Sequence, residues 1–149
     1  MGLVKCKLVS FALQSDVPIW IRQYPHKPQA EEGIADTIRG LLEKGVLEPS
    51  RSEWNTSILP VEKKGTGKYR MAHDLRAINA ALKTATVPVP NPYVALTNLA
   101  LTHEWFTCID LANAFFCLPL ADDCRDIFSF TFSGQQMRYT NCHKALLSH

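Results

Sequence analysis

Residues 57–76 read SILPVEKKGTGKYRMAHDLR, and this stretch decides the fold. Ser57–Val61 is an apolar run typical of a short strand. Gly65-Thr66-Gly67 then breaks the pattern before a second β-prone run begins at Tyr69. Two such runs around a glycine-rich break predict a β-hairpin spanning Lys63–Arg76, with basic arms and a flexible basic tip.

Helices are expected on both sides of this hairpin. In Ala30–Lys44 the apolar residues recur at helical spacing, acidic residues favour the first turn, and Gly45 follows as a stop signal. We therefore expect one amphipathic helix there. Leu75–Leu82 is compatible with a short helix and Tyr93–Leu101 with a weak one, and the prolines of residues 87–92 predict an extended connector between them.

Further strands are expected along the rest of the chain. Trp105–Ile109 is a β-prone apolar run that ends at Asp110. Ile127–Phe132 and Gln136–Tyr139 flank a Ser-Gly pair and predict a second hairpin. Because strands and helices mix without a regular βαβ alternation, the predicted class is α+β.

The composition is that of a single globular domain. The chain has 149 residues, of which 46% are hydrophobic and 20% charged, and this is too apolar for a disordered protein. The net charge of only +2 means that any nucleic-acid contact must come from local clusters of cations. Five cysteines without a CxxC pair favour reduced thiols and an intracellular, cytoplasmic setting. No apolar run approaches the roughly 20 residues that span a bilayer, so no membrane partner is expected.

Asp110 is the first candidate for chemistry. A carboxylate directly after an apolar run is costly to bury unless it is paired with a cation or bound to a metal. In a structural interpretation, Asp110 caps a helix that begins at Leu111. In a functional interpretation, Asp110 is a magnesium ligand. The residues alone leave both interpretations open.

The run Lys63–Arg76 is the second candidate, with five Lys and Arg side chains. A basic hairpin with a glycine-rich tip can close over a triphosphate or a nucleic-acid backbone, and Arg70 and Arg76 suit bidentate phosphate contacts. The alternative is an ordinary solvated hairpin, because exposed hairpin arms normally carry charges.

A series of short motifs is more specific than any one of them. The chain carries, in order, QYP (23–25), GI (33–34), GVL (45–47), WNT (54–56), LPV (59–61), GT (65–66), YR (69–70), DLR (74–76), Asn79, VPNPY (89–93) and DLxxAFF (110–116). In order and spacing, this series resembles the polymerase domain of gammaretrovirus-like reverse transcriptases. The resemblance runs from about Gln23 to about Thr140 and indicates an endogenous retroviral element as the source.

The resemblance implies a fold and a set of site residues. The fold is the fingers subdomain with the first part of the palm, from the RNA-directed DNA polymerase of a Pol polyprotein. By this resemblance Asp110 is a catalytic residue and a ligand of Mg²⁺. Leu111 and Phe115 lie near the incoming nucleotide, and Lys63 and Arg70 hold its triphosphate.

Four further residues are implied as support for the pocket or for bound nucleic acid: Lys64, Lys68, Asp74 and Arg76. The implied partners are an RNA or DNA template-primer and a deoxynucleoside triphosphate. Association with longer polymerase relatives is a further expectation, since a partial palm leaves sheet edges open.

The chain also departs from the family pattern. The family supplies its other catalytic carboxylates from a downstream aromatic-x-Asp-Asp hairpin, which these 149 residues lack. The Asp122-Asp123 pair follows Asp110 too closely and has no preceding aromatic residue, so we expect it in a solvated loop. Asn113 stands where many relatives carry a second Asp.

These departures shape the expected domain organisation and function. Residues 1–22 are expected to form an N-terminal arm, residues 23–140 a partial reverse transcriptase domain, and residues 141–149 a tail that does not match the family. The first hypothesis is a truncated fragment of a nucleotidyltransferase that is inactive alone. The alternative is a non-catalytic nucleic-acid-binding or interaction module derived from it.

Overall fold

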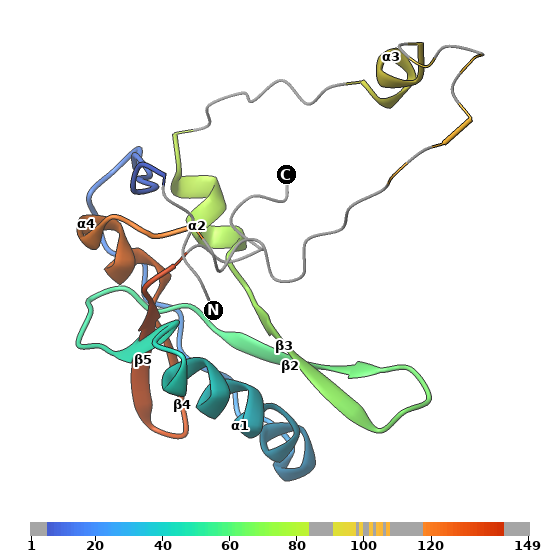
Figure 1. The fold of residues 1–149 in the computed structure, drawn as a ribbon. Coiled ribbons are helices and arrows are strands. Elements are labelled where there is room, and N and C mark those ends of the chain that lie inside the picture. Colours follow the sequence, from blue (N-terminus) through green and yellow to red (C-terminus); the bar gives the residue numbers. More distant parts are fainter. Residues whose placement is uncertain are drawn as a thin grey trace.

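The computed structural model describes residues 6–83, 91–97, 99, 102, 104, 105, 107 and 118–141. Its main elements are a long helix, a two-stranded hairpin and a three-stranded sheet (Figure 1). The predicted connector at residues 87–92 and the predicted strand at residues 105–109 lie largely outside the described residues.

Helix α1, Pro28–Glu43, confirms the predicted helix and begins two residues earlier than expected. Its first position is a proline, whose fixed φ suits a helix start. Ile34, Ile38 and Leu41 form its buried face. Its end is a Schellman motif, in which Gly45 has a φ of 67° and donates to the Leu42 carbonyl at 3.0 Å.

The predicted hairpin is formed by β2, Ile58–Lys63, and β3, Lys68–His73. Gly65 and Gly67 both have positive φ in the turn between them, at 72° and 62°. The ladder pairs Lys63 with Lys68 and ends where Ile58 pairs with His73. Figure 1 shows the hairpin extending past α1, away from the three-stranded sheet.

The second predicted hairpin is also present, with one shorter arm than expected. β4, Phe130–Phe132, pairs with β5, Gln135–Tyr139, around a Ser133-Gly134 turn in which both residues have positive φ. Ile127 and Phe128, predicted as strand, lie in a 3-10 turn, η2 (Asp126–Phe128). β1, Leu47–Pro49, completes the sheet in the order β1-β5-β4 and was not predicted.

The short helices complete the described elements. α2 spans Arg76–Ala81, within the predicted Leu75–Leu82 range, and α3 spans Pro92–Thr97. Asp122-Asp123, predicted in a solvated loop, instead forms the first turn of α4, Asp122–Arg125. The physical reason is favourable charge placement, because acidic residues stabilise a helix N-terminus and Asp122 pairs with Arg125 at 2.9 Å.

The extended N-terminal residues join three separate parts of the fold by backbone hydrogen bonds. Val9 donates to Pro119 and accepts from Ala121, both at 2.9 Å. Further along, Gln14 donates to Ala81 at 2.8 Å, and Ile21 donates to Asn55 at 2.7 Å. These hydrogen bonds hold residues 9–21 against the body of the domain.

The core lies where α1, both sheets and the η2 turn meet. Its largest fully buried side chains include Phe128, Phe130 and Tyr139. His73 is buried at the end of β3, with its Nε2 2.7 Å from the Thr56 hydroxyl and its ring against Phe130. The base of the basic hairpin is therefore part of the core.

The hairpin meets α1 at a glycine. A Cβ placed on Gly33 would lie 2.6 Å from Cδ2 of Tyr69 and 3.1 Å from its Cβ and Cγ. The Cβ and Cγ atoms lie next to the backbone of β3, so a rotation of the ring cannot remove the clash. The close approach of α1 to β3 therefore requires glycine at this position.

We predict opposite effects for two glycine-to-alanine changes in α1. Gly33→Ala should lower the free energy of unfolding by about 1–2 kcal/mol, since overpacking costs about 1–3 kcal/mol and the gain in helix propensity offsets only part of it. Gly40→Ala is the matched control, because nothing lies within 4 Å of its added Cβ. It should raise the free energy of unfolding by about 0.5–1 kcal/mol. Urea denaturation measures both, and an equal stabilisation by the two changes would contradict the packing of Tyr69 on Gly33.

Candidate functional site

The hairpin separates its side chains onto two different faces. Directly paired residues of an antiparallel ladder share a face, and successive residues alternate between faces. One face carries Ile58 and His73, which are buried, and Tyr69, which packs against α1. The other face carries the cross-strand pairs Lys63–Lys68 and Val61–Arg70.

Three cations therefore share the solvent-facing surface of the hairpin, and we call Lys63, Lys68 and Arg70 the basic face. All three are exposed, and Lys64 adds a fourth exposed cation in the adjoining turn. Among the described residues, none of these four side chains forms a salt bridge. Like charges directly opposite one another repel, so the basic face is arranged to attract an anion.

Asp74 and Arg76 lie beyond the hairpin, which corrects the predicted span of Lys63–Arg76. The ladder ends at His73, Asp74 donates its backbone N–H to the Ser57 carbonyl at 2.9 Å, and Arg76 begins α2. The local reason is the carboxylate of Asp74, whose Oδ1 accepts the backbone N–H of Arg76 at 3.3 Å and so satisfies a free donor at the helix start.

Asp74 and Arg76 form a bidentate pair. Nε of Arg76 donates to Oδ1 at 2.8 Å, and Nη2 donates to Oδ2 at 2.6 Å. The hydrogen bond from the Arg76 side chain is the main reason that the pKa of Asp74 lies below its ordinary value, although partial burial opposes the shift. The guanidinium is 88% exposed while its partner is 20% exposed, so Asp74 orients a cation that still faces solvent.

A side chain from the N-terminal segment fixes the base of the hairpin. The amide of Gln23 accepts from the Ile58 N–H at 2.8 Å and donates to the Ile58 carbonyl at 3.0 Å. Nε2 of His26 donates to the same carbonyl at 2.9 Å. Gln23 thereby satisfies the free edge of β2 as a neighbouring strand would, which gives a physical role to the first residue of the QYP motif.

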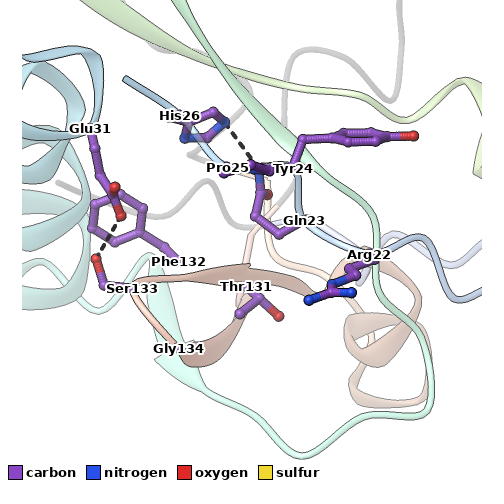
Figure 2. A pocket seen from close by; sticks show the side chains of 10 residues that line it. All are labelled: Arg22, Gln23, Tyr24, Pro25, His26, Glu31, Thr131, Phe132, Ser133 and Gly134. Carbon is purple, nitrogen blue, oxygen red and sulfur yellow. Dashed lines mark hydrogen bonds between the residues drawn. The ribbon is translucent and has the colours of Figure 1, made fainter. Parts of the chain in front are cut away.

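An open groove with a volume of about 610 Å³ lies beside Gln23 and His26 (Figure 2). Residues 22–26 form one wall, and residues 131–134 at the β4–β5 turn form the other. Ser133 donates to the carboxylate of Glu31 at 3.0 Å and so ties that turn to α1. The groove thus combines a cation, Arg22, with an aromatic ring, Tyr24.

Arg22 and Tyr24 were not among the predicted site residues. The signal lies in the alternation of residues 19–24, where Trp20, Arg22 and Tyr24 are exposed and the residues between them are half-buried. Trp20 and Tyr24 are 59% and 62% exposed. Alternating exposed aromatic and cationic side chains on an extended segment are suited to planar, negatively charged ligands.

Asp110, Leu111 and Phe115 lie outside the described residues. The expectations that Asp110 follows a strand and ligates Mg²⁺, and that Leu111 and Phe115 lie near the nucleotide, therefore stay predictions. Over the described ranges, no group of three or more His, Cys, Asp or Glu side chains could hold a metal ion. Across those same ranges, no helix is long and apolar enough to cross a membrane.

Comparison with known proteins places this geometry in a family. The family described as "Reverse transcriptase (RNA-dependent DNA polymerase)" matches residues 61–146. The Gag-Pol polyprotein of feline leukemia virus is 46% identical over 139 residues, and that of baboon endogenous virus (strain M7) is 44% identical over 138 residues. These matches cover 92% and 91% of this chain but only 8% of each polyprotein.

Solved structures agree with the sequence relatives. The native prototype foamy virus protease-reverse transcriptase matches 98% of this chain with a TM-score of 0.86 and 29% identity. A foamy viral protease-reverse transcriptase dRH in complex with double-stranded DNA matches 99% of the chain with a TM-score of 0.84 and 33% identity. The chain covers 19% and 26% of those two proteins. The predicted α+β reverse transcriptase fold and the retroviral relationship are confirmed.

The Asp74–Arg76 pair generates a pH-dependent prediction. Because the pKa of Asp74 is lower in the folded chain, its contribution to stability is present above the ordinary Asp pKa of about 3.9 and is lost as pH falls through the folded value. Asp74→Asn should therefore give a modest loss of stability at pH 7. The difference from the unchanged chain should shrink as pH falls from about 5 to about 3.

Urea denaturation at pH 7, 5 and 3 measures this difference. Asp36→Asn is a matched control, because Asp36 is 87% exposed and its partner Arg39 is exposed as well. That change should alter stability little at any of the three pH values. A difference between Asp74→Asn and the unchanged chain that stays constant down to pH 3 would refute the role given to the carboxylate.

Proposed function

This chain belongs to the reverse transcriptase family, and we propose that it forms the fingers and the first part of the palm of a retroviral RNA-directed DNA polymerase. The proposal rests on one observation above all. One face of the hairpin packs Tyr69 against α1 and buries Ile58 and His73 in the core. The other face holds Lys63, Lys68 and Arg70 together, and all three are exposed. A surface of this kind suits the phosphates of a nucleic acid or a nucleotide.

Within this proposal the cations have two roles. Lys63 and Arg70 bind the triphosphate of an incoming deoxynucleotide, as the family resemblance implies. Lys64, Lys68 and Arg76 contact the backbone of an RNA or DNA template-primer. Asp74 positions the guanidinium of Arg76 through its two hydrogen bonds. Two foamy viral protease-reverse transcriptases have been solved in complex with double-stranded DNA and with an RNA/DNA hybrid, which supports this partner class.

The catalytic part of the proposal concerns residues beyond the hairpin. Asp110 would ligate Mg²⁺, Leu111 would lie beside the nucleotide, and Phe115 would exclude a ribose 2′-hydroxyl. Polymerases use two metal ions to stabilise the attacking and leaving oxygens, and such ions need several carboxylates. The 149 residues contain no aromatic-x-Asp-Asp motif to supply the others. We therefore propose that this polypeptide alone does not catalyse polymerisation.

A second candidate function is a non-catalytic binding module. The basic face does not depend on Asp110, so it can bind nucleic acid without catalysis. Association with longer polymerase relatives would supply the missing palm strands. An intracellular, cytoplasmic setting fits the five cysteines without CxxC spacing, and within the described part Cys6 and Cys124 are both free thiols.

We predict weak, salt-dependent binding of single-stranded RNA or DNA. With no nucleotide bound, Lys63 and Arg70 are free to contact the phosphates of a single strand. The double change Lys63→Ala and Arg70→Ala should therefore weaken binding by about tenfold. It should also make the slope of log affinity against log salt shallower by about 1.4, since two phosphate contacts are lost. Fluorescence anisotropy with a labelled oligonucleotide from 50 to about 200 mM salt measures both quantities.

The matched control is Lys44→Ala with Arg51→Ala, which removes the same two kinds of charge from exposed positions outside the hairpin. It should leave the affinity within about twofold, because net charge alone has only a long-range, screened effect. Equal weakening by both double variants would assign binding to net charge and reject the basic face.

We predict no primer extension by the purified chain with magnesium, deoxynucleotides and any template. With Asp110 as the one carboxylate of the motif, the repulsion between two divalent ions would be uncompensated. Gel analysis of a labelled primer gives the readout. Extension that disappears in Asp110→Ala would overturn the inactive-fragment proposal. Extension that survives this change would come from a contaminating polymerase and leave the chain inactive.

A further inference from the structure

Thr66 at the hairpin tip has an unusual charge environment. It is the one Ser or Thr of the chain with a Lys or Arg both three and two positions before it, Lys63 and Lys64. Lys68 lies two positions after it. Protein kinases select substrates partly by such charge patterns, and a cleft lined by acidic residues would recognise this run.

The tip presents this hydroxyl in open space. Thr66 is exposed, and a Cβ built on either Gly65 or Gly67 would meet no atom within 4 Å. The Thr66 hydroxyl donates to the Lys63 carbonyl at 2.9 Å and accepts from the Lys68 N–H at 3.3 Å. All of these contacts are local and exposed to solvent, so opening the turn into a kinase cleft costs little.

We propose that Thr66 is a phosphorylation site for a basophilic protein kinase, and that the phosphate weakens nucleic-acid binding by the basic face. In the reaction, Oγ1 of Thr66 attacks the γ-phosphorus of the ATP bound by the kinase. A new O–P bond forms, the bond to the β,γ-bridging oxygen breaks, and ADP leaves. The hydroxyl proton passes to the catalytic base of the kinase.

The phosphate would act by charge. It adds about −1.5 to −2 at neutral pH to a tip that holds Lys63, Lys64 and Lys68, with Arg70 further along β3. About half of the four positive charges would then be neutralised within the hairpin. Phosphorylation also removes the hydroxyl proton, so the Lys63 carbonyl loses this donor and keeps the backbone N–H of Thr66, which lies 3.1 Å from it in the unmodified chain. This effect on binding rests on the proposed function, whereas the site itself does not.

The first experiment tests the site on the full 149-residue chain. Incubation with ATP and a kinase of the cyclic-AMP-dependent type should add the mass of one phosphate, and Thr66→Ser should retain it. Thr66→Val preserves the size of the side chain and should abolish it. A chain that gains no phosphate, or a Thr66→Val chain that gains as much as the unchanged one, would overturn the site. A synthetic peptide of residues 60–72 checks that the kinase accepts the sequence, so phosphorylation of the peptide alone would show that the folded turn protects Thr66.

The second experiment tests the consequence with a labelled single-stranded DNA oligonucleotide. The phosphorylated chain should bind about tenfold more weakly at low salt than the unmodified chain, with a salt slope shallower by about one to two. Unmodified Thr66→Val should bind like the unmodified chain. Equal binding before and after phosphorylation would overturn the switch. Absence of binding by the unmodified chain would overturn the proposed function and the switch together, while the mass measurement would still decide the site.

Discussion

The close packing of β3 on α1 is the contact on which the rest of the structure depends. A two-stranded hairpin is marginal in water unless one of its faces is buried against another element. Here Tyr69 lies against Gly33, and His73 at the far end of the strand enters the core beside Phe130. With that face committed to burial, the period of two in the strands leaves the cations of β2 and β3 on the solvent side.

The N-terminal segment also stabilises the hairpin, because it pairs with the free edge of β2. The outer edge of β2 would expose unpaired backbone groups at Ile58 if Gln23 did not occupy them. Asn55 extends this role, because its side chain donates to the Ile21 carbonyl at 2.8 Å and accepts from the Thr131 hydroxyl at 2.8 Å. The buried amide of Asn55 thus connects the N-terminal segment to β4. Gln23, which pairs with the hairpin, and Thr131, which is bound by Asn55, both line the groove.

Local pattern predicted the elements whose signals lie within a few residues. α1 has helical spacing and a glycine stop, and both hairpins have glycine in their turns, so each could be recognised without tertiary information. β1 could not be recognised from the sequence, because three residues ending in proline form a strand only when β5 supplies the partner backbone. The strand prediction was wrong for Ile127 and Phe128, because these two apolar residues are buried in the core as part of a 3-10 turn.

The site residues, too, could be predicted only in part from the sequence. The basic character of Lys63, Lys68 and Arg70 is visible in the sequence, but their common face follows only from the pairing register. A shift of that register by one residue would place Lys68 or Arg70 against α1. Burial of an unpaired cation there would be costly. The register that packs Tyr69 on Gly33 is therefore also the register that keeps the cations in solvent. The stability of the hairpin and the proposed phosphate contacts therefore both depend on one strand alignment. A change that weakens the packing of the buried face should also disturb the common orientation of the cations on the opposite face.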